Sequence, residues 1–141
     1  HSIFGDIFLV EIRRYREKQL ARAGLKGAFP LWGMNTKALA KEFIKIGFKA
    51  IVVSVDSRKL NKSFAGKIYD ENFLEDLPDQ VDPCGENGEF HTFVYDGPVF
   101  KQPVNFEKGE IIYKQYPSPD KNHSEQNIGF WFCNLYEKSV T

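Results

Sequence analysis

Residues 48–55, Phe-Lys-Ala-Ile-Val-Val-Ser-Val, constrain the fold of this chain more than any other segment. The run is almost continuously apolar and rich in β-branched side chains, which is typical of a buried strand. It follows residues 37–46, where apolar side chains recur at helical spacing after a cap at Asn35 or Thr36, and Gly47 separates the two. A buried strand so close behind a helix predicts an α/β or α+β fold, with helices packed against a sheet.

The remaining segments predict one domain, residues 1–141, with a mixed sheet of about four to six strands and two or three helices. The other expected elements are helices at 7–23 and 70–77, strands at 91–99, 110–114 and 129–135, an extended segment at 25–33, and a loop or short helix at 60–66. Residues 79–87 contain turn formers and are expected to be a loop, and the polar residues 116–127 are expected to be a mobile insertion.

The first expected helix has a clear apolar face. Asp6 is its predicted N-cap, and Gly24 is its predicted C-terminal stop. Phe8, Ile12 and Tyr15 recur at a spacing of three to four residues, which predicts the helix. Arginine side chains cover the other side.

The formal net charge is zero, but the charge is unevenly distributed along the chain. Residues 1–50 contain ten Lys/Arg against four Asp/Glu, and residues 51–100 contain four against ten. We expect these two parts to attract each other across the fold, and the balanced total argues against direct nucleic-acid binding. No apolar run reaches the roughly eighteen residues of a membrane-spanning helix. Two cysteines make no disulfide framework and suit the cytoplasm.

Residues 84–92 concentrate the polar chemistry of the chain. They combine a thiol, two carboxylates, an amide, an imidazole and two glycines immediately before an apolar-aromatic strand. Sites are commonly built this way, on a loop held by a rigid scaffold. The glycines are expected to let the backbone approach a ligand and to leave several N–H groups free for an anion. Glu86 and Glu89 could hold a cation, transfer a proton or coordinate Mg²⁺, and the simpler alternative is a solvated turn.

The same region allows other interpretations. Cys84 and His91 could form a nucleophile pair, or could bind zinc together with Cys133 and His123, although no Cys-x-x-Cys pair is present. Trp32 and the aromatic residues of the strand that follows residues 84–92 could belong to the core, or could line a pocket for a quaternary ammonium group. The sequence contains neither a Gly-x-x-x-x-Gly-Lys-Ser/Thr loop nor a Gly-x-Gly-x-x-Gly motif.

Four segments carry a resemblance to a known family. They are Phe-Gly-Asp-Ile at 4–7 with Arg13, Arg16 and Glu17, then Phe-Pro-Leu-Trp-Gly at 29–33, Gly-Phe-Lys-Ala-Ile-Val-Val at 47–53, and Asp-Pro-Cys-Gly-Glu-Asn-Gly-Glu-Phe-His-Thr-Phe at 82–93. Together they resemble the C-terminal half of the diphthine–ammonia ligase family, which are ATP pyrophosphatases related to the PP-loop enzymes. The resemblance covers nearly the whole chain, and the Cys-Gly-Glu-x-Gly-Glu segment is its most specific part.

The resemblance implies an ATP-dependent amide ligase. ATP would adenylate the carboxylate of diphthine on elongation factor 2, and ammonia would displace AMP to leave diphthamide. In such families an N-terminal α/β domain binds the nucleotide on a Ser-Gly-Gly-Lys-Asp-Ser type loop, and that motif is absent here. We therefore expect this chain to be the substrate-side domain, inactive alone, with ATP and Mg²⁺ bound mainly by a domain that this chain lacks. Because the chain starts at His1 without an initiator methionine, we expect that an upstream segment is not represented.

The resemblance also suggests roles for individual residues. The expected catalytic residues are Cys84, Glu86 and Glu89; the expected substrate-binding residues are Trp32, Gly85, Asn87, Gly88, His91 and Thr92; and Arg13 and Arg16 are expected to face the nucleotide. No residue is expected to bind a resident metal. A cytoplasmic location and a homodimer are compatible with the resemblance.

Three alternatives remain open from the sequence. The chain could be a substrate-recognition or dimerisation module without chemistry of its own. A bacterial relative could amidate a carboxylate other than that of diphthine. A thiol- or metal-dependent hydrolase would use Cys84, His91 and Glu89 instead.

Overall fold

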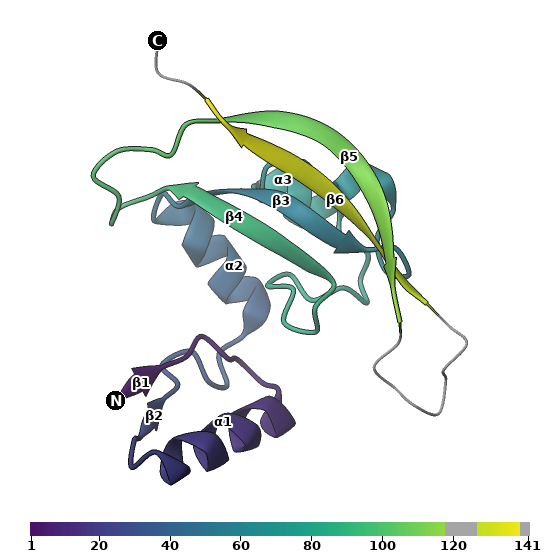
Figure 1. The fold of residues 1–141 in the computed structure, drawn as a ribbon. Helices are drawn as coiled ribbons and strands as arrows, with labels where there is room; N and C mark the ends of the chain where they lie inside the picture. The colour runs from purple at the N-terminus through teal and green to yellow at the C-terminus, as the bar shows by residue number, and fades with distance from the viewer. Residues whose placement is uncertain (118–126, 139–141) are drawn as a thin grey trace.

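The computed structural model describes residues 1–117 and 127–138, which form two unequal parts (Figure 1). The smaller part, residues 1–34, is here called the N-terminal unit. It contains strand β1 (Ser2–Ile3), helix α1 (Val10–Arg22) and strand β2 (Gly27–Ala28), and its two strands pair in parallel.

The larger part, here called the C-terminal domain, begins at residue 35. It contains α2 (Thr36–Lys45), β3 (Lys49–Asp56), the 3-10 turn η1 (Lys62–Phe64), α3 (Glu71–Asp76), β4 (Phe90–Asp96), β5 (Phe106–Tyr116) and β6 (Ile128–Glu137). Over the described residues, three α-helices accompany six strands in two sheets of two and four strands. This arrangement confirms the predicted α/β (or α+β) class. None of the described helices is long and apolar enough to cross a bilayer.

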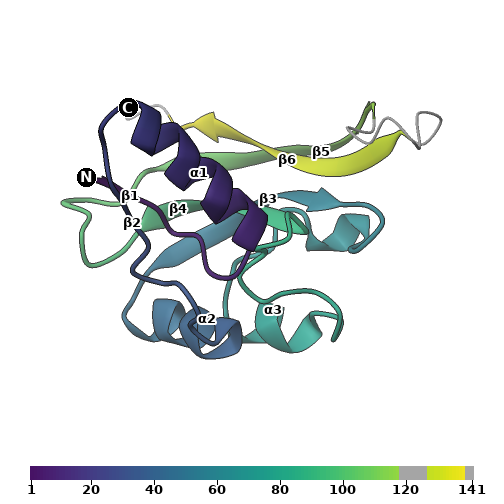
Figure 2. The ribbon, with the colours of Figure 1, turned by 90° about the horizontal axis from the view of Figure 1, so that it is seen from below.

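The four-stranded sheet is antiparallel and has the order β4–β3–β6–β5. β6 pairs with β3 only at residues 54–56, because residues 66–69 occupy the rest of that edge of β3. The amide of Val52 donates to the Lys67 carbonyl at 2.9 Å, and the amide of Gly66 donates to the Val52 carbonyl at 2.7 Å. The β5–β6 ribbon therefore diverges from β3, and it lies on the opposite side of β3 and β4 from α2 and α3 (Figure 2).

The core lies where α2 and α3 meet β3 and β4. Val52 and Val55 of β3 and Phe73 of α3 are almost completely buried, and the rings of Tyr69 and Phe90 lie 5.3 Å from the ring of Phe73. Burying each large apolar side chain stabilises the fold by roughly 1.5–3 kcal/mol. The central place of β3 agrees with its continuous apolar sequence.

Helices α2 and α3 begin close to where the sequence predicts, because both have side-chain caps. Asn35 accepts a hydrogen bond from the Ala38 amide at 2.9 Å, and Asp70 accepts one from the Phe73 amide at 2.8 Å. Each cap satisfies one amide that the first helical turn leaves without a partner.

Helix α1 begins at Val10 rather than Ile7, and the prediction that Asp6 is its N-cap is wrong. The N-cap is Leu9, whose side chain makes no capping hydrogen bond. The Asp6 carboxylate instead accepts hydrogen bonds from Arg16, from Nε at 2.7 Å and from Nη2 at 3.2 Å. Asp6 therefore forms a tertiary ion pair with Arg16 instead of the N-cap that the local sequence pattern predicts.

Two of the apolar side chains whose spacing predicts α1 face solvent. Ile12 and Tyr15 are 42% and 63% exposed. Arg13, Arg16 and Leu20 are the partly buried residues of this helix. The guanidinium groups of Arg13 and Arg16 lie 4.6 Å from the ring centres of Phe29 and Phe4 respectively. Cation–π contacts of this kind help to hold the arginine-bearing side of the helix against the two strands.

Strand boundaries differ from the expected ones in the last third of the chain. β5 extends from Phe106 to Tyr116, well beyond the predicted 110–114, because nearly its whole length pairs with β6. β4 ends at Asp96, where a turn closed by a 3.0 Å hydrogen bond from the Phe100 amide to the Gly97 carbonyl follows. Most of the predicted mobile insertion, residues 118–126, lies outside the described residues.

Candidate functional site

The loop before β4 is held together by its own carboxylates. Oδ2 of Asp82 accepts hydrogen bonds from the amides of Cys84 at 3.1 Å and Glu86 at 3.0 Å. Oε1 of Glu89 accepts from the amide of Asp82 at 3.1 Å, which closes the loop on itself. This loop, residues 82–89, is called the carboxylate loop below.

Glu89 is a buried member of this loop, only 3% exposed. Besides Asp82, it accepts from Asn87 twice, from the backbone amide at 3.0 Å and from Nδ2 at 3.0 Å. Burying a carboxylate is costly unless hydrogen bonds replace the lost water, and three donors meet that requirement here. Asn87 therefore contacts Glu89 directly, and both side chains are used inside the loop.

The two glycines of the loop adopt backbone conformations that L side chains rarely take. Gly85 and Gly88 have φ angles of 65° and 80°. A Cβ atom at Gly85 would also lie 2.8 Å from the Phe90 carbonyl, so the loop could not keep this shape with a larger residue.

The amides of the carboxylate loop are already paired. The Gly85 amide donates to the Asp82 carbonyl at 2.8 Å and the Gly88 amide donates to the Gly85 carbonyl at 2.9 Å. With the hydrogen bonds to Asp82 and Glu89, every amide from 84 to 88 has an acceptor within the loop. The expectation that this loop leaves free N–H groups for an anion is therefore wrong.

Glu86 joins the carboxylate loop to the N-terminal unit. Its Oε1 accepts a hydrogen bond from the amide of Ile7 at 2.7 Å, and the Ile7 side chain is buried. The carbonyl of Ile7 accepts a second bond from the Gly33 amide at 2.8 Å. The carboxylate loop and the N-terminal unit, which are far apart in the sequence, are thus joined at the peptide groups of Ile7.

A cavity of about 250 Å³ lies between the N-terminal unit and the C-terminal domain, next to this junction. Its walls are mostly apolar and come from Ile7, Leu31, Leu39, Ala40, Phe43, Tyr69, Cys84, Phe90, Thr92 and Val94. Of the predicted site residues, the structure brings Cys84 and Thr92 together here. Phe90 is one of the aromatic residues expected either in the core or at such a pocket. Phe43 and Tyr69 are not among the predicted site residues, because their spacing in the sequence resembles that of ordinary core.

Cys84 carries a protonated thiol at neutral pH. Burial, followed by the nearby charges of Asp82 and Glu86, raises the pKa of Cys84 to about 11. Sγ donates a 3.3 Å hydrogen bond to the carbonyl of Thr36. The thiolate is the nucleophilic form of cysteine, so this environment does not favour nucleophilic attack.

Tyr69 anchors the carboxylate loop through a hydrogen bond from its hydroxyl group. Its hydroxyl donates to the Pro83 carbonyl at 2.6 Å, and burial raises the pKa of this phenol. The hydroxyl therefore stays protonated and keeps the hydrogen bond across the accessible pH range.

His91 and Trp32 do not line the cavity that Cys84 borders. Phe90, Thr92 and Val94 line the cavity, so the alternation of β4 places His91 on the opposite face of the strand. The structure thus does not pair His91 with Cys84. Trp32 lies under the guanidinium of Arg13, with 4.6 Å between the guanidinium carbon and the ring centre.

The two expected nucleotide-facing arginines are engaged within the N-terminal unit. Nε of Arg13 donates to Glu17 at 2.9 Å, and Arg16 forms the two-bond pair with Asp6. Their side chains are nevertheless 33% and 38% exposed.

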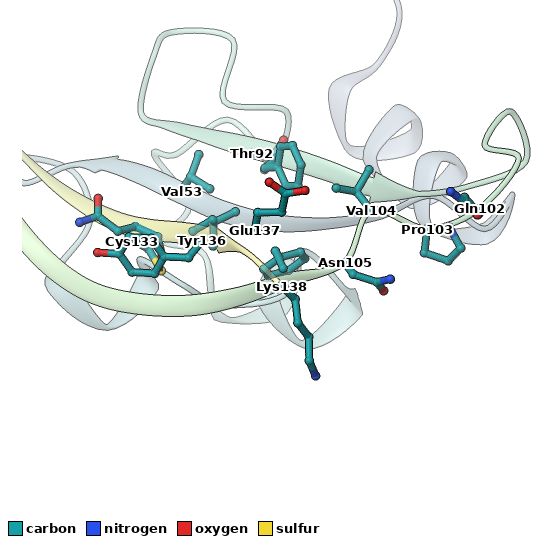
Figure 3. A pocket seen from close by; sticks show the side chains of 14 residues that line it. Val53, Thr92, Gln102, Pro103, Val104, Asn105, Cys133, Tyr136, Glu137 and Lys138 are labelled. Atoms are coloured by element: carbon teal, nitrogen blue, oxygen red, sulfur yellow. The ribbon is translucent and has the colours of Figure 1, made fainter. Parts of the chain in front are cut away.

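A second, larger cavity of about 840 Å³ opens between β4 and the β5–β6 ribbon (Figure 3). It is bordered by residues 102–106 and by the end of β6. Of the candidate site residues, its walls include Thr92 and also Cys133, which the sequence suggested only as a possible zinc ligand. Over residues 1–117 and 127–138, no three His, Cys, Asp or Glu side chains come together as a metal site, and His123 lies outside that range.

Comparisons with known proteins agree with the resemblance in the sequence. Residues 35–118 match the family model of the diphthamide synthase C-terminal domain. The chain is 32% identical to the diphthine–ammonia ligase of Bos taurus over 110 residues, which are 74% of this chain and 41% of that protein. It is 33% identical to that of Danio rerio over 113 residues (74% and 43%), and 29% identical to that of Schizosaccharomyces pombe over 112 residues (77% and 18%). The chain spans less than half the length of these relatives. Since the matched model covers more than half of the chain, the chain belongs to the diphthamide synthase family and contains its C-terminal domain.

Proposed function

We propose that this chain is the substrate-side part of an ATP-dependent ligase that converts diphthine on elongation factor 2 into diphthamide. ATP would adenylate the diphthine carboxylate with release of pyrophosphate, and ammonia would then displace AMP. The family match and the name diphthine–ammonia ligase shared by the relatives support this proposal. ATP, accompanied by Mg²⁺, would be bound mainly outside this chain, which has no phosphate-binding loop.

The observation that carries the substrate-side role is the aromatic cavity beside the carboxylate loop. Phe43, Tyr69 and Phe90 contribute ring surfaces to it, and the Glu86 carboxylate accepts a hydrogen bond from the amide of Ile7, which also lines it. Diphthine carries a quaternary ammonium group, which binds favourably against aromatic faces near negative charge. We place that group in this cavity, with the Thr92 hydroxyl and the Cys84 thiol as polar wall atoms.

The nucleotide side of the proposal concerns Arg13 and Arg16. The paired loop amides leave no anion-binding backbone at residues 84–88, so the exposed parts of these guanidinium groups are the better candidates to face AMP or pyrophosphate. Arg13→Ala in the longer enzyme should raise KM for ATP and leave KM for the protein substrate unchanged. Unchanged ATP affinity and turnover would remove this part of the proposal.

A second candidate is a recognition role without chemistry in this chain. The buried Glu89, Asp82 and the protonated Cys84 are all used to shape the loop, which favours binding over acid–base or nucleophilic catalysis. Under this candidate Glu86, Glu89 and Cys84 shape the loop beside the substrate cavity, while a separate nucleotide domain performs the adenylation.

The test uses the longer protein that carries this chain, with diphthine-bearing elongation factor 2, ATP and ammonia. Formation of the amide with equal release of AMP supports the ligase. Phe43→Leu should then raise KM for the protein substrate by about tenfold through loss of one aromatic face. The matched control is Phe48→Leu, because Phe48 stacks on Phe43 but does not line the cavity.

Three results would change the conclusion. AMP release with a carboxylate other than diphthine would indicate amidation of another substrate. Binding of the modified factor without any ATP-dependent product would favour the recognition module. Equal effects of the Phe43 and Phe48 substitutions would remove the aromatic cavity as the ammonium site.

A further inference from the structure

The larger cavity, between β4 and the β5–β6 ribbon, is bordered by the end of a strand and is here called the β6 groove. It has a volume of about 840 Å³ (Figure 3). Val53, Phe93 and Val104 give it apolar surface, and Leu135 and Glu137 of β6 line it as well. Apolar side chains beside the edge of a strand are the two features of a site that binds an extended peptide.

The peptide groups of β6 alternate between its two neighbours in the sheet. The Gly129 carbonyl accepts a hydrogen bond from the Ser57 amide at 2.9 Å, on the side of β3. The Lys138 amide donates to the Asn105 carbonyl at 3.5 Å, on the side of β5. Since successive peptide groups of a strand point to opposite edges, the odd-numbered residues of β6 direct theirs to the β3 side.

The β3 side of β6 is open where the strand borders the groove. Pairing with β3 extends only over residues 130–132 of β6. The odd-numbered residues beyond Cys133 are Leu135 and Glu137, and over residues 1–117 and 127–138 no backbone hydrogen bond reaches them from that side. An open edge of this kind can pair with one more strand.

Thr92 connects the β6 groove to the aromatic cavity beside the carboxylate loop, because it lines both. The aromatic cavity has a volume of about 250 Å³, which suits the end of one modified side chain and not the polypeptide that carries it. In the function proposed above, diphthine is part of elongation factor 2. The residues on either side of it must therefore lie on the surface next to the cavity, and the β6 groove is a hollow that adjoins it.

The geometry points to the β6 groove as the site that binds the segment of the protein substrate flanking diphthine, in the form of an extended strand added beside β6. Leu135 and Glu137 exchange backbone hydrogen bonds with this segment, and its apolar side chains pack on Phe93 and Val104. The inference rests on the proposed function and deepens it, because it states where the polypeptide of the substrate lies.

Residue-resolved hydrogen exchange in the longer protein tests the added strand. Diphthine-bearing elongation factor 2, added without ATP, should slow exchange of the Leu135 and Glu137 amides by at least about tenfold. The amides of Asn134 and Tyr136 already point to β5, so their exchange should change much less. This alternation distinguishes an added strand from a partner that only covers the surface, which would slow all four amides.

Val104→Asp tests the groove by substitution. The added carboxylate would lie against the apolar wall, and it should raise KM for the protein substrate by at least about tenfold while KM for ATP stays the same. The matched control is Val99→Asp, which should change neither value. Val99 belongs to the same connection between β4 and β5, is 78% exposed and does not line the groove.

The outcomes separate this inference from the proposed function. Amide formation on the factor with equal KM values in the two variants, or without slower exchange at Leu135 and Glu137, would overturn the groove as the docking site and leave the ligase standing. Slow exchange of these amides that depends on protein concentration, without the factor, would also overturn it and assign the groove to a second copy of the chain. If the factor neither bound nor reacted, the proposed function would fail and the inference with it. If binding slowed the two amides without any product, the groove would stand and only the ligase chemistry would fail.

Discussion

At the scale of single residues, the carboxylate loop shows how functional side chains can be consumed by structure. Glu89 accepts from Asp82 once and from Asn87 twice, and Asp82 accepts from two further amides. A short loop with two left-handed glycines has few other ways to satisfy its buried peptide groups. The acidic and amide residues that suggested a site in the sequence are therefore also the residues that give the loop its shape.

The substitution Glu89→Gln tests this structural role. The glutamine side chain would keep one acceptor oxygen but turn an NH₂ group toward a loop amide, leaving a buried donor without an acceptor. We expect a loss of about 1–3 kcal/mol in the free energy of unfolding, measured by urea denaturation. Glu75→Gln, at an exposed position of α3, is the control and should change stability by less than about 0.5 kcal/mol. Equal stability of the two variants would show that the Glu89 hydrogen bonds contribute little.

The reactivity of Cys84 provides a second prediction at this scale. Because its pKa is raised to about 11, the thiolate fraction stays small through neutral pH and grows only as the pH approaches 11. Alkylation of Cys84 by iodoacetamide, followed by peptide mass spectrometry, should be slow at pH 7 and should still be accelerating at pH 10. A rate that levels off near pH 9, as for an exposed cysteine, would contradict this environment.

At the scale of elements, the hydrogen bond from the Ile7 amide to Glu86 links the segment before α1 to the C-terminal domain. Hydrogen bonds to a charged acceptor contribute about 1.5–3 kcal/mol. Glu86→Ala should therefore speed hydrogen exchange at the Ile7 amide by about tenfold or more, while the β3 amides stay unchanged. Glu42→Ala, on the exposed side of α2, is the control. Unchanged exchange at Ile7 would mean that apolar contacts alone hold the N-terminal unit in place.

Elements determined by local pattern were predicted well from the sequence, and those determined by tertiary contacts were not. The β3 and α2 ranges lie within one residue of the predicted ones, because a continuous apolar run and an Asn35 cap act locally. The start of α1 departs from the local pattern because Asp6 pairs with Arg16, and the length of β5 depends on pairing with β6. Neither dependence is visible in the spacing of apolar residues.

The candidate site also contains some residues that the sequence predicts and others that only the tertiary structure shows. Cys84 and Thr92 were predicted from the concentration of polar groups before β4, and the structure places both at the cavity wall. Phe43 and Tyr69 come from segments far from that loop and carry only a core-like pattern, so no signal in the sequence distinguished them. The glycine content of the loop predicts free amides. In the structure these amides are paired, because carboxylates within the same loop accept hydrogen bonds from them.

At the scale of the whole molecule, the two parts are stabilised very differently. The C-terminal domain has a continuous core around Phe73, whereas α1 has no fully buried residue and β1 and β2 pair over only two positions. Local stability follows buried apolar contact, so in the chain of 141 residues α1 should open more easily than β3.

Native-state hydrogen exchange of this chain should show the amides of residues 10–22 exchanging at least about a hundredfold faster than those of residues 50–55. Their exchange should depend weakly on added urea, since opening α1 exposes little new surface. If both segments instead exchanged by one common transition with the same urea dependence, the N-terminal unit and the C-terminal domain would form a single cooperative unit. The small junction at Ile7 and Glu86 would then couple them more strongly than its contacts suggest.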